Sequence, residues 1–272
     1  MGEPSILSVL RERAGLTPDE HAFTFTDYDR NWDGVAESPS WSQLYRRTLN
    51  VAQEVGRHGS PGDRALIVAP QGLPFIVAFL GAMQAGFIAV PLAVPVPGSH
   101  DERLGAVVTD TSPAVVLTTT DVFDIAAQYV DDGAAVIAAI AVDTLDLDAT
   151  PLVGPEIPAG PDIAYLQYTS GSTRLPAGVM ISHRNLCANF EQLMPDYFFR
   201  SGGVVPPGGQ LVSWLPFYHD MGLMLGIAAP ILDGCGADLL SPLAFLARPA
   251  RWLQTLSRHD KAFSAAPNFA FD

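Results

Sequence analysis

The stretch Tyr165-Leu-Gln-Tyr-Thr-Ser-Gly-Ser-Thr-Arg-Leu-Pro-Ala-Gly-Val179 joins a β-rich run, residues 163–168, to a loop of glycine and small hydroxyl residues. Gly171 lets the backbone approach an anion without a Cβ in the way. Clustered hydroxyls and backbone N–H groups form anion-binding concavities, so we predict that this loop binds phosphate. Its hydroxyl groups belong to Thr169, Ser170, Ser172 and Thr173.

Two large enzyme classes are excluded by the spacing of this loop. Gly171 is not followed by four residues and then Gly-Lys-Ser/Thr, so the loop is not a Walker A motif. The pattern Gly-x-Ser-x-Gly is absent around Ser170 and Ser172, which excludes a nucleophile elbow. The residues alone leave open that the segment is a Ser/Thr-rich surface turn.

The segment resembles the phosphate-binding motif of the adenylate-forming superfamily, which includes acyl-CoA synthetases, peptide-synthetase adenylation domains and fatty acyl-AMP ligases. Where the usual pattern has Gly and Lys, this chain has Arg174 and Ala177, and that variant resembles the fatty acyl-AMP ligases of mycobacterial lipid synthesis. Ser213-Trp-Leu-Pro-Phe-Tyr-His-Asp-Met-Gly-Leu223 resembles the same branch's segment beside the acyl and ATP sites. Residues 41–45 and 263–271 fit more weakly, so the resemblance covers nearly the whole chain.

The resemblance implies an activity with ATP and Mg²⁺. A long-chain fatty carboxylate attacks the α-phosphate of ATP, which gives an acyl-adenylate and pyrophosphate. The acyl group then passes to the phosphopantetheine thiol of an acyl carrier protein or polyketide synthase in lipid biosynthesis. Two alternatives remain: an acyl-CoA ligase fragment, since the insertion that separates the branches lies outside this chain, and a non-catalytic remnant that only binds a ligand or partner.

The resemblance also implies a fold: the N-terminal part of the adenylate-forming enzyme, truncated, with two parallel-sheet α/β lobes and flanking helices. We predict a first lobe over 1–142, a Pro-rich linker over 143–162, and an incomplete second lobe over 163–272 that carries the phosphate loop. Family members are about twice as long and keep several motifs downstream, so we expect this chain to be inactive alone.

His219 is the candidate catalytic residue. It follows Pro216 and precedes the apolar stretch 221–232, so we expect it where a strand gives way to a helix. Its imidazole can contact a phosphate or carboxylate oxygen, while Asp220 fixes its tautomer or caps the helix. The other interpretation is a core histidine beside a plain helix cap.

The other candidates fall into two groups. Arg174 can neutralise phosphate charge in place of the missing lysine, or it is a solvated loop residue. Large apolar side chains beside a strand are more often core than pocket wall. The candidates for ATP and phosphate binding are Thr169, Ser170, Gly171, Ser172, Thr173 and Arg174. The acyl-pocket candidates are Trp214, Phe217, Met221 and Gly222.

Composition limits the remaining possibilities. With 48% hydrophobic and 16% charged residues among 272, the chain can build a sizeable core. A net charge of −14, with 15 Lys and Arg, argues against binding nucleic acid through bulk charge. Cys187 and Cys235 are far apart and lack a CxxC pattern, so we expect free thiols and no metal site.

The order of apolar runs predicts an α/β protein. Residues 64–119 alternate strands and helices as β-α-β-α-β, with strands apolar on both faces, which predicts a parallel sheet covered by helices. Prolines and glycines interrupt the charge-free stretch 65–99, which favours a buried helix between strands over a transmembrane segment. Residues 1–10 lack a basic segment before an apolar core, so we expect no secretory signal and a cytoplasmic location.

Overall fold

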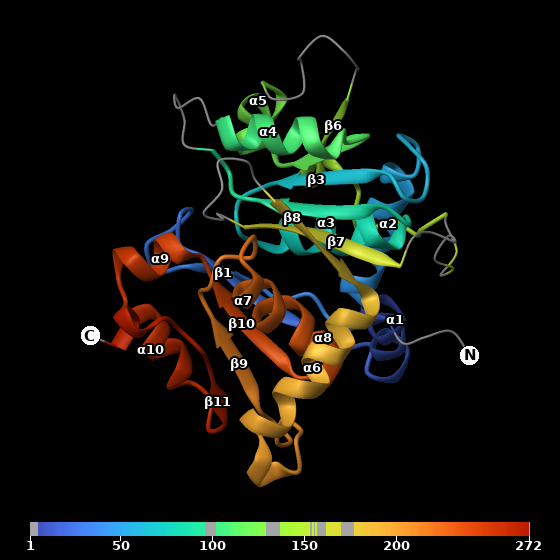
Figure 1. The fold of residues 1–272 in the computed structure, drawn as a ribbon. Helices are drawn as coiled ribbons and strands as arrows, with labels where there is room; N and C mark the ends of the chain where they lie inside the picture. Colours follow the sequence, from blue (N-terminus) through green and yellow to red (C-terminus); the bar gives the residue numbers. More distant parts are fainter. Residues whose placement is uncertain are drawn as a thin grey trace. The chain divides into compact units, whose positions relative to one another are not determined.

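The computed structural model describes residues 5–95, 102–128, 137–152, 154, 156, 162–169 and 177–271. Helices and mostly parallel strands alternate along the chain (Figure 1). The chain divides into two compact units, each with its own sheet. Unit 1 comprises residues 1–45 and 183–272, and unit 2 comprises residues 46–182.

Unit 2 is built on a six-stranded sheet that is parallel except at one edge, where β8 runs antiparallel to β7. Leu66 pairs with Val90 on one side and Val116 on the other, which aligns apolar residues across the middle of the sheet. In spatial order the strands are β6 (Ala138–Ala141), β5 (Val115–Thr118), β3 (Arg64–Val68), β4 (Ile88–Leu92), β7 (Ile163–Thr169) and β8 (Ala177–Ser182).

Helices cover both faces of this sheet (Figure 1). On one face, α4 (Glu102–Thr111) and α5 (Phe123–Ala127) pack on a cluster that includes Leu66 and Val90. On the other, α3 (Leu73–Gln84) is buried along nearly its whole length. The predicted buried helix between strands is therefore confirmed, and no helix among the described residues is long and apolar enough to cross a membrane.

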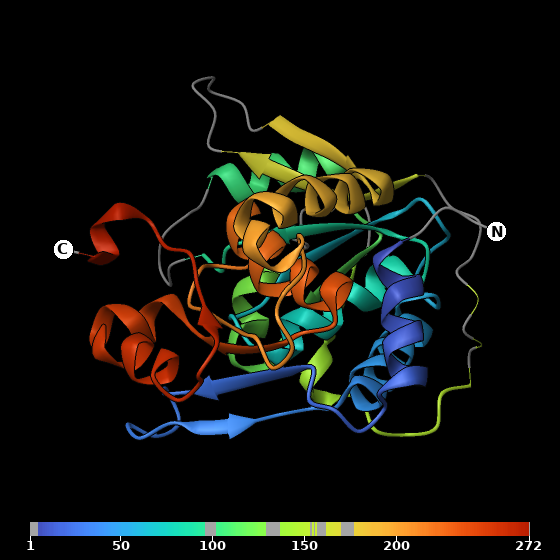
Figure 2. The same cartoon turned by 90° about the horizontal axis from the view of Figure 1, so that it is seen from below.

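Unit 1 contains a five-stranded sheet. It is parallel except for the pair β1 and β2, two blue arrows that point in opposite directions in Figure 2. In spatial order its strands are β11 (Ala262–Phe263), β9 (Gln210–Ser213), β10 (Gly236–Leu240), β1 (Phe23–Asp27) and β2 (Val35–Glu37). Its helices are α1 (Ile6–Leu16), α6 (His183–Tyr197), α7 (Asp220–Leu223), the π-helical turn η4 (Met224–Ala228), α8 (Ala229–Asp233), α9 (Pro242–Ala247) and α10 (Ala250–Leu256).

The helix α2 (Trp41–Val55) begins with a capping box and crosses the division between the units. Ser40 N–H donates to Gln43 Oε1 at 2.9 Å, and Gln43 N–H donates to Ser40 Oγ at 3.4 Å. Each side chain thus satisfies a backbone donor at the helix start, as the sequence pattern predicts.

The two units do not coincide with the predicted segments 1–142 and 163–272. Strand β7 pairs with β4 through Ala89 and Tyr165, so it joins the sheet of unit 2. The N-terminal 45 residues group instead with residues 183–272, because β1 pairs with β10. The first part of the predicted linker also contacts a helix, since Asp148 Oδ1 forms an ion pair with Arg47 Nε of α2 at 3.0 Å.

Candidate functional site

His219 lies at the start of α7, where the chain has left β9 through Trp214, Leu215 and Pro216. Its backbone is extended, and its N–H donates to Pro216 O at 3.1 Å. The expected position between a strand and a helix is confirmed. His219 itself is the N-cap and Asp220 is the first helical residue, so the interpretation of Asp220 as the cap is wrong.

The contacts of His219 assign its tautomer. Its Nδ1 lies 2.6 Å from Asp220 Oδ1, and the same carboxylate oxygen accepts the Met221 N–H at 2.6 Å. The Met221 N–H is also 3.4 Å from Nδ1, but its bond to Asp220 is shorter, so we assign Nδ1 as a donor to the carboxylate. Nε2 is then the ring nitrogen that can meet a ligand.

The imidazole of His219 is not part of the core. Its side chain is 63% exposed and that of Asp220 is 72% exposed, which contradicts the core-histidine interpretation. When such an exposed ring is neutral, its Nε2 can accept a hydrogen bond from a ligand. When the ring is protonated, Nε2 can donate a hydrogen bond to an oxygen anion. The geometry suits contact with a charged substrate.

The four acyl-pocket candidates belong to the segment that carries His219, and most of their side chains are buried in the core of unit 1. Phe217 is 1% exposed and Trp214 is 4% exposed, with the Trp214 ring stacked on Phe245 at 3.9 Å between centroids. Met221 packs against the cluster that contains Trp214. Gly222 is buried, and a Cβ there would lie 2.1 Å from Pro216 O, so glycine lets α7 pack on the preceding turn.

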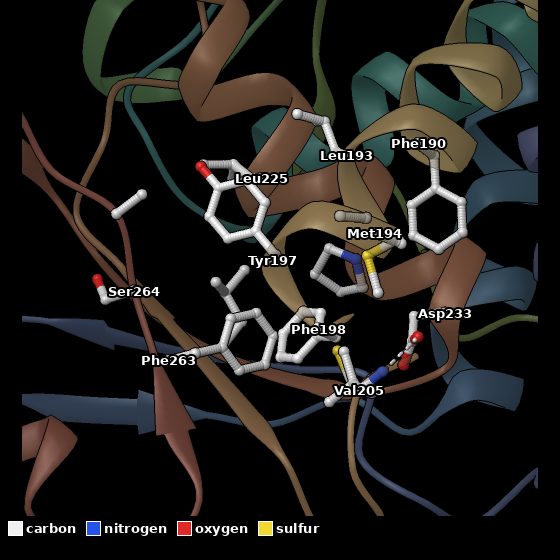
Figure 3. A pocket seen from close by; sticks show the side chains of 15 residues that line it. Phe190, Leu193, Met194, Tyr197, Phe198, Val205, Leu225, Asp233, Phe263 and Ser264 are labelled. Atoms are coloured by element: carbon white, nitrogen blue, oxygen red, sulfur yellow. Dashed lines mark hydrogen bonds between the residues drawn. The ribbon is translucent and has the colours of Figure 1, made fainter. Parts of the chain in front are cut away.

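An apolar pocket lies elsewhere in unit 1 (Figure 3), and its cavity volume is about 50 Å³. None of the four acyl-pocket candidates lines it. The lining residues come from α6, η4, α8, β9, the β11 segment and the loops that follow α6 and α8: Phe190, Leu193, Met194, Tyr197, Phe198, Val205, Leu211, Leu225, Ala229, Pro230, Asp233, Cys235, Phe263, Ser264 and Ala265.

A sequence signal for part of this lining was present. Phe190, Leu193, Met194 and Tyr197 stand at positions i, i+3, i+4 and i+7 of α6, which places them on one helical face. The other lining residues come from distant segments, and no local spacing relates them.

The pocket has few polar groups, among them the Asp233 carboxyl and the Cys235 thiol. Burial raises the pKa of the Asp233 carboxyl, while the Val205 N–H at 3.3 Å and the Arg13 guanidinium act against this rise. Burial, together with the charge of Asp233, raises the pKa of the Cys235 thiol to about 12, so the thiol stays protonated. The pocket therefore favours an apolar ligand.

The phosphate loop is described only at its ends. Thr169 is exposed at the last position of β7 and pairs with Ala177 at the first position of β8. Ser170, Gly171, Ser172, Thr173 and Arg174 lie outside the described residues. Among the described residues, no three His, Cys, Asp or Glu side chains gather as a metal site.

Comparisons with known proteins agree with the predicted resemblance. Residues 10–271 match the family model described as AMP-binding enzyme. A Mycobacterium leprae protein named putative fatty-acid–CoA ligase fadD21 is 61% identical over 274 residues, covering 100% of this chain and 47% of that protein. The long-chain-fatty-acid–AMP ligase FadD23 of Mycobacterium tuberculosis is 57% identical over 270 residues, with coverages of 98% and 46%.

The fold is shared with a solved structure of a fatty acyl-adenylate ligase from Legionella pneumophila in complex with acyl adenylate and pyrophosphate. The TM-score is 0.81 at 33% identity, over 98% of this chain and 45% of that chain. This confirms the predicted adenylate-forming fold, while the chain spans about half the length of the curated relatives it matches. With the family model matched over nearly all of its residues, the chain belongs to the AMP-binding enzyme family of adenylate-forming ligases.

Proposed function

We propose that this chain is part of a fatty acyl-AMP ligase that joins a long-chain fatty acid to the AMP moiety of ATP and releases pyrophosphate. The observation that carries the proposal is the apolar pocket of unit 1, whose wall is formed almost entirely by hydrocarbon side chains. An alkyl chain gains free energy by leaving water for such a wall, at about 0.8 kcal/mol per buried CH₂.

The chemistry asks the protein to hold two anionic reactants in line. A carboxylate oxygen forms a bond to the α-phosphorus as the bond to pyrophosphate breaks, and negative charge accumulates on the leaving group. We assign phosphate binding to the hydroxyls and N–H groups of residues 169–174. We assign to His219 Nε2 a contact with a carboxylate or phosphate oxygen.

Mg²⁺ fits this proposal as an ion that arrives with ATP. Proteins usually hold it through one or two carboxylates and the substrate phosphates, so a dedicated cluster of acidic residues is not required. When bound, it supplies positive charge to the phosphates. Trp214, Phe217, Met221 and Gly222 then support the segment that carries His219, since none of them lines the pocket.

The acceptor and the cellular setting are part of the proposal. We propose transfer of the acyl group to an acyl carrier protein or polyketide synthase in the cytoplasm, as in lipid biosynthesis. Relatives are named both fatty-acid–CoA ligase and fatty-acid–AMP ligase, so CoA is the competing acceptor. Because this chain spans about half of those relatives, we expect it to bind ligands without completing the reaction alone.

Binding of dodecanoate to the 272-residue chain tests the pocket assignment. Ala229→Phe places a ring in the pocket, and we expect it to weaken dodecanoate binding at least tenfold in isothermal titration calorimetry. The matched control is Ala250→Phe, because Ala250 is exposed on α10 and does not line the pocket. Unchanged affinity in Ala229→Phe, or no binding by the wild-type chain, would contradict the assignment.

A fusion of this chain to the downstream half of the M. leprae relative tests the reaction. We expect fatty-acid-dependent ATP–pyrophosphate exchange from the fusion and none from the chain alone. Release of acyl-adenylate that is not converted to acyl-CoA when CoA is added would support the AMP ligase. Rapid conversion to acyl-CoA would favour the CoA ligase, and a fusion without exchange would favour a non-catalytic remnant.

A further inference from the structure

Tyr168 connects the end of strand β7 to the last turn of helix α4. Its phenol donates a hydrogen bond to the Asp110 carboxylate, 58 residues away in the sequence. Its ring packs on the apolar cluster beneath α4 that includes Leu104 and Val107. Tyr168 therefore contacts both the sheet and the helix that covers it.

Arg64, at the start of β3, holds the turn that carries Asp110. Arg64 Nε donates to Thr111 O at 2.5 Å, and its Nη2 donates to Ser112 O at 2.9 Å. These bonds hold the carbonyls at the C-terminal end of α4. Asp110 thus presents its carboxylate from a turn that is anchored to the central strands.

The Tyr168 ring also lies on strand β8. Tyr168 pairs with Gly178 in the antiparallel ladder, and a Cβ on Gly178 would lie 2.9 Å from Tyr168 Cζ and 3.1 Å from its Oη. Real Cβ atoms essentially never approach so closely, so glycine is needed for the ring to cross the strand. One residue further along the ladder, Thr169 pairs with Ala177.

The Tyr168 phenol keeps its proton well into the alkaline range. Burial, followed by the hydrogen bond to Asp110 and the charge of that carboxylate, raises the pKa of the Tyr168 phenol well above its usual value. The phenol therefore stays a donor at neutral pH. A hydrogen bond to an ionised carboxylate is about twice as strong as one between neutral groups.

We propose that Tyr168 is a positioning residue for phosphate binding, which fixes Thr169 and Ala177 by tying both strands to Asp110 on α4. The inference rests on the proposed function, in which residues 169–174 bind phosphate. Thr169 follows Tyr168 directly, so a shift of the ring moves the end of β7. Phosphate chemistry is sensitive to such shifts because displacement of about 1 Å lowers rates by about a hundredfold.

The experiment measures binding of Mg²⁺–pyrophosphate and Mg²⁺–ATP to the 272-residue chain by isothermal titration calorimetry. We expect Tyr168→Phe and Asp110→Asn each to raise the Kd at least fivefold. The Kd of the double variant should be no higher than that of the single variant with the higher Kd, because both changes remove the same hydrogen bond. Gly178→Ala, which displaces the ring without touching its hydroxyl, should also raise the Kd.

Two control variants separate positioning from general stability. Tyr45→Phe removes a buried phenol that has no hydrogen-bond partner among the described residues, so its Kd should equal that of wild type. Asp143→Asn weakens bonds to Thr120 in the same unit, so it should lower the Tm and leave the Kd unchanged. Dodecanoate binding should be equal in all variants, because the pocket lies in unit 1.

The outcomes separate this inference from the function on which it rests. Wild-type affinity in Tyr168→Phe and Asp110→Asn, with a lowered Tm, would overturn the positioning role and leave the proposed function intact. Failure of the wild-type chain to bind either phosphate probe would overturn the phosphate assignment, and the inference with it.

Discussion

Gly222→Ala is the substitution for which the structure predicts the clearest effect. Gly222 is the third residue of α7 and is buried. A Cβ at this position would lie 2.1 Å from Pro216 O, 2.7 Å from Pro216 C and 3.0 Å from Leu215 C. All three are backbone atoms, so no side-chain rotation can relieve the overlap.

The size of the effect follows from this overlap. Carbon and oxygen atoms approach to about 3.3 Å in close contacts, so α7 or the turn at Pro216 must move by about 1 Å. Overpacking of this kind costs about 1–3 kcal/mol. Alanine is favoured over glycine in a helix by about 1 kcal/mol, which offsets part of the loss. We therefore expect a net loss of up to about 2 kcal/mol in the free energy of unfolding.

The displacement also reaches the candidate catalytic residue. Pro216 O accepts the His219 N–H at 3.1 Å, so a shift of that carbonyl moves the backbone of His219. In the fusion with the downstream half of the relative, Gly222→Ala should therefore lower the rate of ATP–pyrophosphate exchange as well as stability.

Urea denaturation of the 272-residue chain, followed by circular dichroism, measures the change. Gly105→Ala is the matched control, because Gly105 lies inside helix α4 and a Cβ there meets nothing within 4 Å. Gly105→Ala should stabilise the chain by about 0.5–1 kcal/mol. A Gly222→Ala chain as stable as Gly105→Ala would refute the overlap and the close packing of α7 on Pro216.

Three further predictions concern single side chains. His219→Ala should lower exchange by the fusion at least tenfold and cost less than about 1 kcal/mol of stability, because the ring is 63% exposed; the reverse pattern would make His219 structural. The hydrogen bond from Arg47 lowers the pKa of Asp148 in the folded chain. The pair therefore stabilises the fold at pH values above the unfolded pKa of the carboxyl, and this stabilisation is lost as the pH falls through the folded pKa. In Arg47→Met, the free energy of unfolding should therefore fall less steeply with decreasing pH than it does in the wild-type chain. An unchanged slope at acid pH would contradict the role of the pair. Iodoacetamide at pH 8 should modify Cys235 more slowly than Cys187, since burial raises the Cys235 pKa to about 12; equal rates in mass spectra would show that Cys235 is accessible.

Local patterns in the sequence predict the elements of this fold well. The pattern Ser40-x-x-Gln43 forms a capping box, and both of its hydrogen bonds join residues only three apart. Residues 64–119 form β3, α3, β4, α4 and β5, which is the predicted alternation of strands and helices. Each of these features depends on neighbours in the chain, which is why the sequence alone suffices.

The grouping of elements into units depends on distant pairs and was not predictable in the same way. The Pro-rich stretch after residue 143 suggested a boundary, but β7 pairs with β4 across it through Ala89 and Tyr165. Proline and glycine mark the places where regular structure stops, and they do not tell which sheet the next strand will join. The pocket was missed for a similar reason, since its wall combines α6 with residues more than 60 positions away, such as Phe263.

The π-helical turn η4 shows how one residue of the sequence shapes that pocket. Pro230 has no N–H, so the carbonyl of Gly226 cannot accept the bond that a regular α-helix would make four residues later. The preceding turn widens instead, and the Ala229 N–H donates to Met224 O, five residues back. Leu225 and Ala229, within and just after this turn, both line the pocket together with Pro230. Turns of this kind recur at functional sites, and here the proline that ends the regular hydrogen bonding also stands in the pocket wall.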